Sequence, residues 1–408
     1  MLGMGMLVVF GALGLSQFSY PAILPAMQKA LHLSNTQAGA LAAANLAGYT
    51  CMTALGGALA FRFGLRRVIL TGLLVAAAGV LITGAAGGFA VAAAGRVCNG
   101  VGAAAASVPA HTIPSQWFSQ RRRGIATGVI VLGPPLGLIV SGPLVPRLVA
   151  AYGESGWRIA WYVLATVTLL VAVVGYFVIR DRPDESLAPP DRPLRPPEAR
   201  RPGLRAVYGN ASIWRINAVF FTFGFAFMTY MTFFAKRLIA DLHYSAVAAG
   251  NVFLIMGVVS LACGIMWGYI SDRIGRKHAM ALVLSAQAVS FAIFALWTDT
   301  LGVLLSAVLF GLTVWAMPAI TAATCGDVVG TALAPTAYGF ITMFGGFGQA
   351  LGPFIGGRLA DSFPTFTVSY LVAAGVAILG AIWALLMPLG HRPKGNVSFD
   401  AETHAHGR

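Results

Sequence analysis

Apolar segments of about twenty residues recur along the whole chain, and this recurrence limits the possible folds more than any single motif. A helix needs about 20 mainly apolar residues to cross the roughly 30 Å hydrocarbon core of a bilayer. Each segment is long enough to do so. The sequence therefore predicts an all-α membrane protein with twelve transmembrane helices, expected at residues 4–27, 36–60, 68–86, 89–110, 124–149, 157–179, 214–234, 246–270, 279–297, 301–324, 335–357 and 367–387.

The composition agrees with a chain that lies mostly in a lipid bilayer. Hydrophobic residues make up 58% of the 408 and charged residues 10%, whereas a soluble domain carries about 25% charge. The net charge of +14 would suggest a nucleic-acid partner in a soluble protein. Here alternating spans bring most basic residues to one side, which is the cytoplasmic side. We therefore expect no nucleic-acid partner and two cytoplasmic termini, with only a few basic residues on the outer side: Lys29, Arg147, Arg158, Lys236, Arg237 and Arg358.

A segment rich in proline and charge divides the twelve apolar segments into two sets of six. Residues 180–211 cannot bury a core and are expected to form a cytoplasmic linker. The sequence thus predicts a six-helix unit at 1–179, a second at 212–390 and a cytoplasmic tail at 391–408. The first segment has no cleavage site followed by a soluble domain, so we interpret it as a span rather than a signal peptide. The four isolated cysteines indicate neither a metal site nor a disulfide framework.

Residues 268–277, named here the signature loop, are short, charged and placed between two apolar segments. Gly275 permits a tight turn, and Arg273 and Arg276 mark the surface as cytoplasmic. Asp272 can accept hydrogen bonds from the N–H groups that open the next helix. The pattern G-x-x-x-D-R-x-G-R-K resembles the signature loop of the major facilitator superfamily of secondary transporters. The resemblance implies a monomer without cofactor or metal in a bacterial inner membrane, similar to porters of organic anions and monocarboxylates.

The two sets of six segments repeat each other. Arg62 corresponds to Arg273 and Gly64 to Gly275, while Phe61 stands where the second copy has an aspartate. Transporters of this class are built from two parallel halves with the binding site between them. The sequence therefore predicts two pseudo-symmetric six-helix bundles. As the resemblance implies, the signature loop would latch the cytoplasmic ends of the halves together when the outer side is open.

A glycine–proline pattern in residues 335–357 includes Gly352 and Pro353 and resembles a superfamily motif associated with antiporters. Glycines at helical spacing let two backbones approach closely, and proline bends a helix. The pattern therefore indicates either an antiporter or close helix packing alone.

Arg96 lies about eight residues inside the fourth expected span, within the pattern R-x-x-x-G-x-G that matches a third motif of the superfamily. An arginine near the bilayer centre costs at least about 2.5–3.5 kcal/mol on insertion scales. No Asp or Glu lies well inside any expected span. The partner of Arg96 is therefore either backbone carbonyls with water, or an anionic substrate. If the span boundary lies elsewhere, Arg96 could instead extend to the interface.

His111 follows on nearly the same face of that span, with Ser107 between them. Its ordinary pKa is near neutral, so it could accept a proton that travels with an anion; it could equally be a satisfied interfacial residue. Together with Arg96 and His111, further polar and aromatic side chains are expected to line the cavity between the halves: Gln17, Tyr20, Asn45, Tyr49, Tyr230, Trp315 and Gln349.

These residues predict a transporter that moves a small, monocarboxylate-like organic anion by alternating access, with protons moving alongside or by uncoupled exchange. The alternative is an efflux antiporter for drugs or hydrophobic compounds, which the aromatic second half and the glycine–proline pattern favour. A sugar porter would need more polar cavity residues. A membrane enzyme would need paired catalytic groups, and His111 has no acid within helical reach. A receptor or scaffold without transport would leave the internal repeat unexplained.

Overall fold

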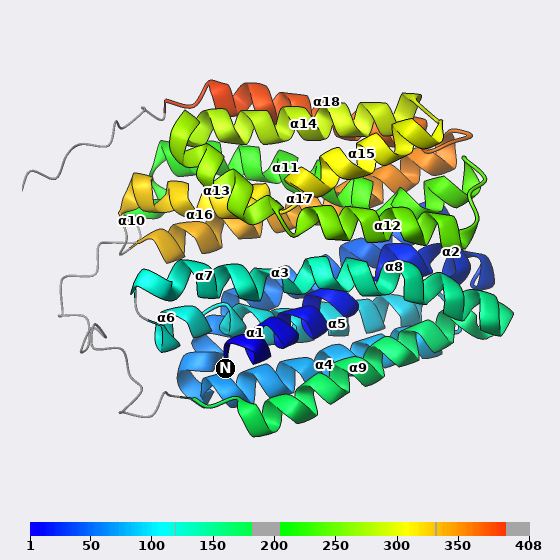
Figure 1. Ribbon diagram of the computed structural model, residues 1–408, viewed down its shortest axis with the longest axis horizontal. Coiled ribbons are helices and arrows are strands. Elements are labelled where there is room, and N and C mark those ends of the chain that lie inside the picture. Colours follow the sequence, from blue (N-terminus) through cyan, green and yellow to red (C-terminus); the bar gives the residue numbers. More distant parts are fainter. Residues whose placement is uncertain (119, 182–204, 331–332, 389–408) are drawn as a thin grey trace, which may run out of the picture.

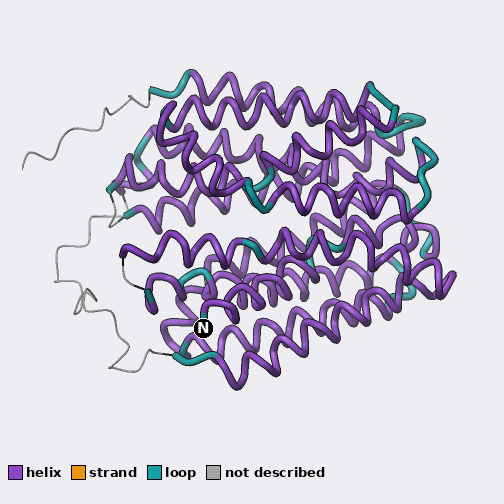
Figure 2. Tube along the Cα trace, in the orientation of Figure 1, coloured by secondary structure: helices purple, strands orange, loops and turns teal. Residues whose placement is uncertain are grey.

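The computed structural model describes residues 1–118, 120–181, 205–330 and 333–388. These residues form helices joined by short turns, with no strand among them (Figure 1 and Figure 2). The all-α class predicted from the sequence is confirmed. Most of the expected linker at 180–211 and the whole expected tail at 391–408 lie outside the described residues.

The first half, up to residue 181, contains α1 (Leu2–Val9), the π-helical η1 (Phe10–Leu15), α2 (Tyr20–Ala30), α3 (Asn35–Phe63), α4 (Leu65–Ala85), α5 (Phe89–Ala110), α6 (Ile113–Trp117), α7 (Gln120–Val131), α8 (Gly133–Tyr152), η2 (Gly153–Ser155) and α9 (Gly156–Val178). The second half, from residue 205, contains α10 (Arg205–Tyr208), α11 (Ala211–Ala240), α12 (Ala246–Ser260), α13 (Cys263–Ile274), α14 (Arg276–Leu296), α15 (Thr300–Thr313), α16 (Ala316–Val329), α17 (Ala334–Ser362) and α18 (Thr367–Leu385).

These helices make up the twelve predicted transmembrane units, six in each half. Eight units are single helices: α3, α4, α5, α9, α11, α14, α17 and α18. The other four are made of consecutive pieces, namely α1–η1–α2, α7–α8, α12–α13 and α15–α16. In Figure 1 the helices of the first half lie below those of the second half, and the two sets run side by side along the long axis of the molecule.

The helices α3 and α17 differ from the others in composition. By length and hydropathy, up to nine stretches of the described chain qualify as membrane spans, one of which, Gly124–Val178, holds two units; α3 and α17 are not among them. Both have 29 residues and pack against each other across the two halves. A Cβ added at Gly39 would lie 2.0 Å from the Pro353 carbonyl oxygen, and one at Gly357 would lie 2.2 Å from that of Asn35. Because protein covers these faces, α3 and α17 need less apolar surface.

The glycine–proline pattern lies on α17 and makes close helix contacts. A Cβ at Gly352 would lie 2.3 Å from the Phe225 carbonyl oxygen of α11, while Pro353 faces Gly39 of α3. The close-packing interpretation of the pattern therefore accounts for both residues.

Four units are interrupted along their length, and three of these breaks bear on the candidate site. Residues 16–19 separate η1 from α2, residues 314–315 separate α15 from α16, and α12 and α13 meet at a 45° bend. An interruption leaves backbone groups without helical partners, which a membrane protein tolerates only where protein or a water-lined cavity surrounds them. Discontinuous helices of this kind form the substrate sites of many transporters.

The predicted repeat is visible in the backbone of the two short turns at the signature loop and its first-half counterpart. Gly64 has φ 90° and ψ 150°, and Gly275 has φ 88° and ψ 150°. A positive φ of this size is rarely adopted by residues with a side chain. Both positions therefore require the glycine that the sequence provides.

A second pair of turns also repeats, which the sequence analysis did not detect. His32 and His243 are the described non-glycine residues with positive φ, at 50° and 57°. Each stands two residues before a serine that caps the next helix: Ser34 Oγ accepts from the Gln37 N–H, and Ser245 Oγ accepts from the Ala248 N–H, both at 3.1 Å. The pattern Leu-His-x-Ser thus opens α3 and α12 in the same way.

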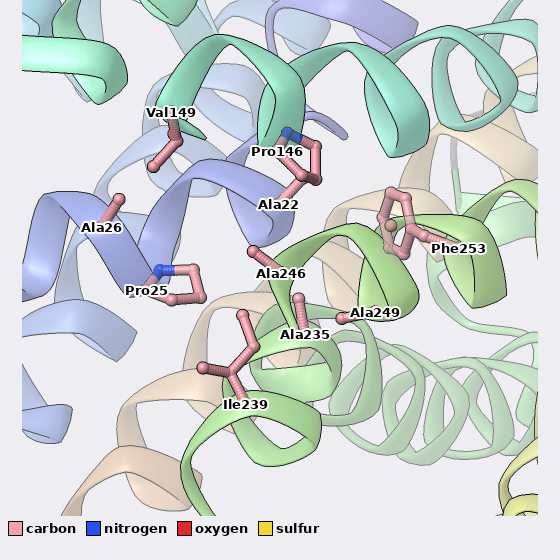
Figure 3. A pocket seen from close by; sticks show the side chains of 11 residues that line it. Ala22, Pro25, Ala26, Pro146, Val149, Ala235, Ile239, Ala246, Ala249 and Phe253 are labelled. Atoms are coloured by element: carbon pink, nitrogen blue, oxygen red, sulfur yellow. The ribbon is translucent and has the colours of Figure 1, made fainter. Parts of the chain in front are cut away.

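The two halves are packed together mainly at the end away from the signature loop, named here the opposite end. Contacts between the halves join α3 to α17, α8 to α12 and α2 to α11. A Cβ at Gly250 would lie 2.1 Å from the Gly142 carbonyl oxygen. A small apolar cavity of about 40 Å³ lies in this seam. Figure 3 shows three of its lining residues, Ala22, Pro146 and Ala249, which come together from α2, α8 and α12.

Candidate functional site

Arg96 is buried inside the first half, with 1% of its surface exposed. It lies on α5, and its Nη1 donates a hydrogen bond to the Ser16 carbonyl oxygen at 3.2 Å. This carbonyl belongs to the interruption between η1 and α2. The broken first unit therefore supplies an acceptor to the buried cation. Of the two partners considered for Arg96 in the sequence analysis, this one is a backbone carbonyl.

Two aromatic rings cover the guanidinium of Arg96. Its Cζ lies 4.6 Å from the centroid of the Tyr20 ring and 5.7 Å from that of Trp161. Contacts of this kind with desolvated rings contribute up to about 2 kcal/mol. The Nε and Nη2 atoms, in contrast, are buried and have no hydrogen-bond partner in the described chain. Every carboxylate of the described residues lies at or within two residues of a helix end or in a turn: Glu154, Asp181, Asp241, Asp272, Asp299, Asp327 and Asp361.

Asn45 holds α3 against α5 directly beside Arg96. Its Nδ2 donates to the Arg96 carbonyl oxygen at 3.0 Å and to Asn99 Oδ1 at 2.7 Å. The Tyr20 hydroxyl likewise bonds to the Ala38 carbonyl oxygen of α3 at 2.7 Å. Asn45 and Tyr20 are both buried, so in this conformation they position Arg96 rather than face an open cavity.

Ser107 contacts both Tyr49 of α3 and His111 at the end of its own helix α5; its contact with Tyr49 was not predicted from the sequence. The Tyr49 hydroxyl lies 3.4 Å from Ser107 Oγ, and His111 Nδ1 lies 2.7 Å from the Ser107 carbonyl oxygen. Tyr49 is half-buried and His111 is exposed. His111 caps the end of α5 and is separated from Arg96 by the rest of that helix.

The interruptions of the first, eighth and tenth units meet where the two halves touch. Phe18 packs edge-on against Trp315, with ring centroids 5.2 Å apart, and lies 6.5 Å from Phe227 of α11. The backbone N–H of Trp315 donates a hydrogen bond to Cys263 Sγ at 3.3 Å. The Nε1 of Trp315 is buried without a partner among the described residues, as is the side-chain oxygen of Gln17. Phe18 and Cys263 were missed by the sequence analysis, because only the fold brings the three interruptions together.

Tyr230 and Gln349 lie apart from this meeting point. Tyr230 is fully buried in an aromatic cluster inside the second half, and its hydroxyl lies 2.7 Å from Ser306 Oγ. Gln349 is half-buried on α17, where its side chain packs against Gly224 of α11. In this conformation the packing of the second half accounts for Tyr230.

The signature loop makes ion pairs within the second half. Arg276 Nη1 lies 2.7 Å from Asp272, and Arg276 Nε lies 3.1 Å from Asp327 of α16. The prediction that Asp272 caps the next helix was wrong: among the described residues its carboxylate pairs with the side chain of Arg276 and not with the backbone N–H groups that open α14. Asp272 lies inside α13, two residues before its end, and pairs with the arginine four residues later. Arg273 lies over the Tyr269 ring at 4.2 Å.

The first-half counterpart of the signature loop uses an acid that the sequence analysis did not assign. Phe61 replaces the aspartate there, and Arg62 lies 5.4 Å from the ring of Phe63. Asp181, just after α9, accepts a hydrogen bond from the Arg66 backbone N–H at 2.8 Å, at the start of α4. A distant carboxylate thus caps the helix that Asp272 was expected to cap in the second half.

The second half also contains a buried arginine, Arg237, which the sequence analysis counts among the basic residues on the outer side of the membrane. Arg237 on α11 is 1% exposed. Its Nη2 donates to the Ala295 carbonyl oxygen at 2.8 Å, and its Nη1 donates to Thr367 Oγ1 at 3.2 Å. Asp241 lies 3.9 Å from Nη1, one helical turn later. Arg237 therefore has polar partners on both terminal nitrogens.

Comparison with known proteins gives consistent matches over most of the chain. The family profile described as Major Facilitator Superfamily matches residues 6–346 and 238–406. The hexuronate transporter of Bacillus subtilis (strain 168) is 24% identical over 392 residues, which cover 91% of this chain and 90% of that protein. The probable sulfoacetate transporter SauU of Cupriavidus necator is 25% identical over 391 residues, covering 89% and 87%. The crystal structure of a bacterial homolog of the human lysosomal transporter Spinster, inward-facing and unoccupied, has a TM-score of 0.75 at 14% identity, covering 95% and 94%.

Proposed function

The chain belongs to the Major Facilitator Superfamily, and from this premise we propose that it carries a small organic anion across a membrane by alternating access. Membership makes the chain a membrane transporter and not an enzyme. One observation carries the proposal for the cargo: the edge of Arg96 formed by Nε and Nη2 is buried and has no acceptor in the described chain.

The chemistry of this Nε–Nη2 edge suits a carboxylate. The N–H bonds of Nε and Nη2 point in parallel from one side of the planar guanidinium, and a carboxylate accepts both at once. Such charge-assisted pairs are about twice as strong as neutral hydrogen bonds. A buried cation with this edge unpaired favours a ligand that carries the missing negative charge.

The relatives support the same class of cargo. The hexuronate transporter and the probable sulfoacetate transporter are named for organic acids, and each aligns with about nine tenths of this chain. A monocarboxylate or another small organic acid is therefore the cargo that we propose.

The meeting point of the three interruptions is the proposed entrance to Arg96. Gln17 follows directly on Ser16, whose carbonyl oxygen binds Arg96, and Trp315 approaches from the second half. The indole N–H of Trp315 is a donor without a partner in the described chain and would suit the second oxygen or a hydroxyl group of the cargo. Since Arg96 is closed off in this conformation, we propose that the residue 16–19 segment moves when the cargo binds.

The packing of the halves fits one state of an alternating-access cycle. The seam is closed at the opposite end, and the ion pairs of the signature loop stay within the second half. With the signature loop in the cytoplasm, this arrangement is inward-facing. The proposed setting is a bacterial inner membrane, with both termini cytoplasmic, a monomeric chain and the signature loop engaging across the halves only when the outer side opens.

His111 is the proposed site of proton coupling. It is exposed at the end of α5 and connected to Tyr49 through Ser107. A proton taken up there would move together with the anion. The dependence of anion uptake on an imposed proton gradient, in the protein as it is and in His111→Gln, tests this role; equal dependence in both would exclude it.

Uptake by the purified protein in proteoliposomes tests the proposed function. The vesicles are offered radiolabelled glucuronate, acetate or sulfoacetate, and tetraphenylphosphonium serves as a lipophilic cation. We expect saturable uptake of at least one acid, inhibited by the other acids. Uptake of the cation alone would contradict the proposal.

The second candidate is an exporter of hydrophobic compounds. It is favoured by the aromatic contact between the halves, where Phe18 meets Trp315 and Phe227. Binding measured by thermal shift separates the two candidates, because a lipophilic cation would raise the melting temperature of an exporter whereas organic acids would raise that of an anion transporter.

A further inference from the structure

Asp361 joins the two halves at the opposite end of the molecule. It lies one residue before the end of α17, and its carboxylate accepts hydrogen bonds from the first two backbone N–H groups of α3. Asn35 N lies 2.8 Å from Oδ1 and Thr36 N lies 2.7 Å from Oδ2. The Thr36 hydroxyl donates a third bond to Oδ2 at 2.6 Å. A charged side chain of the second half thus caps a helix of the first half.

The start of α3 is complete only with this carboxylate. Ser34 and Gln37 form a capping box in which Ser34 Oγ binds the third N–H of the helix, so the first two N–H groups need another acceptor. An anion is also favoured there by the helix dipole. Partial burial raises the pKa of the Asp361 carboxyl, but the bonds from Thr36 and Asn35 outweigh it and hold the pKa below its ordinary value. The carboxyl is therefore charged at neutral pH.

The corresponding contact on the other side of the seam has no charge. Pro146 of α8 takes the position of Asp361 when the glycines at 137 and 352 are aligned. It faces Gly250 of α12, where an added Cβ would lie 2.8 Å from the proline ring. Of two equivalent contacts between the halves, one is apolar and one depends on a carboxylate.

We propose that Asp361 is the latch that holds the opposite end closed, and that its release from α3 is a step in opening that end. A polar vestibule of about 390 Å³ adjoins the contact and is lined by Lys236, Asn35 and Asp361. Water in this vestibule can hydrate the carboxylate and the freed N–H groups, so the latch can open without leaving a buried charge unpaired. The latch is independent of which cargo the protein carries.

The alkylation rate of a cysteine in the seam measures opening directly. Ala249 is 1% exposed and lines the apolar cavity of Figure 3. Protein with Ala249→Cys in sealed vesicles is treated, without any cargo, with a membrane-impermeant maleimide from the side of Asp361. The labelling of the same protein without Ala249→Cys is subtracted, which removes the contribution of the native cysteines. We expect Asp361→Asn to raise the rate about tenfold, the factor that corresponds to 1.4 kcal/mol.

Two further variants decide between a latch and general loosening. Asp241 also caps a helix, accepting a bond from the Phe366 N–H at 2.8 Å, but within the second half, so Asp241→Asn should leave the rate within twofold. Thr36→Val removes one of the three bonds and should raise the rate less than Asp361→Asn. An unchanged rate in both Asp361→Asn and Thr36→Val would overturn the latch, as would an equal rise in Asp241→Asn. Since no cargo is present, these results do not depend on the anion proposal.

Discussion

The two buried arginines, Arg96 in the first half and Arg237 in the second, meet the same physical problem with different outcomes. Each is 1% exposed, lies over two aromatic rings and donates to one backbone carbonyl oxygen. Arg237 also has a threonine hydroxyl and the carboxylate of Asp241. Arg96 has neither, and its Nε–Nη2 edge is unpaired in the described chain.

This difference separates an arginine that stabilises the fold from one that can bind a ligand. Rings and a carbonyl together offset most of the cost of burying a guanidinium, since each contributes on the order of 1–3 kcal/mol. Both arginines can therefore be tolerated in the membrane. Only Arg96 retains two parallel donors, which is the feature that a carboxylate recognises.

The largest expected effect is on transport by Arg96→Gln. The change removes the charge and the paired donors, so we expect initial uptake of an organic acid to fall at least about a hundredfold. The melting temperature in detergent should stay within a few degrees, because removing a buried charge also removes an insertion cost of about 2.5–3.5 kcal/mol. Arg158→Gln is the matched control: Arg158 also donates to a carbonyl oxygen and lies over a ring, but at a helix end. Full uptake by Arg96→Gln would make Arg96 structural.

A somewhat smaller effect on transport is expected when a carboxylate is introduced near Arg96, as Asp241 stands near Arg237 in the second half. Gln17→Glu places a carboxylate next to Ser16, at the proposed entrance to Arg96. This internal anion would compete with the cargo for Arg96. We expect the uptake rate at low cargo concentration to fall about tenfold, because displacing the internal anion costs about 1.4 kcal/mol. At high cargo concentration the uptake rate should recover in part. Gln17→Met, of similar size and uncharged, should retain more activity. Equal activity of the two variants would place position 17 away from the path of the anion.

Stability, and not transport, should change when Arg237 is replaced. Arg237→Gln leaves Asp241, whose side chain is 11% exposed, without its cation, and breaking such a pair costs about 3 kcal/mol. The melting temperature should fall clearly, while uptake per correctly folded molecule stays within about twofold. A large loss of uptake by folded protein would show that the two arginines do not differ in role.

Several features of the fold follow from local sequence. The twelve units follow from the length of the apolar segments, and the two signature turns follow from glycines at Gly64 and Gly275, where positive φ is required. The position of Arg96 inside a span follows from counting residues along a helix. In each case the determining residues are neighbours in the chain.

Other features depend on residues that are distant in the chain and could not be predicted in this way. The Ser16 carbonyl becomes an acceptor for Arg96 only because the first unit is interrupted, and Asp361 meets α3 from more than 300 positions away. The sequence predicts Arg237 on the outer side of the membrane, but it does not show that the rings of neighbouring helices bury it there. Tyr230 was expected to line the cavity and is instead buried inside the second half, because its place along a helix does not say whether that face meets a cavity or another helix.

The smallest expected effect, from Asp241→Asn, tests the comparison itself. Asparagine keeps an oxygen for the Phe366 N–H and removes only the charge, which lies 3.9 Å from Arg237. A loss of about 1 kcal/mol in stability is expected, smaller than for Arg237→Gln because Arg237 keeps its other acceptors, and is measured by denaturation in detergent. Arg237 would then lack a carboxylate, as Arg96 does, yet both of its terminal nitrogens would keep acceptors in Ala295 and Thr367. If anion binding rises in this variant, a missing carboxylate alone is enough to create a site; if binding is unchanged, the unpaired Nε–Nη2 edge is what distinguishes Arg96.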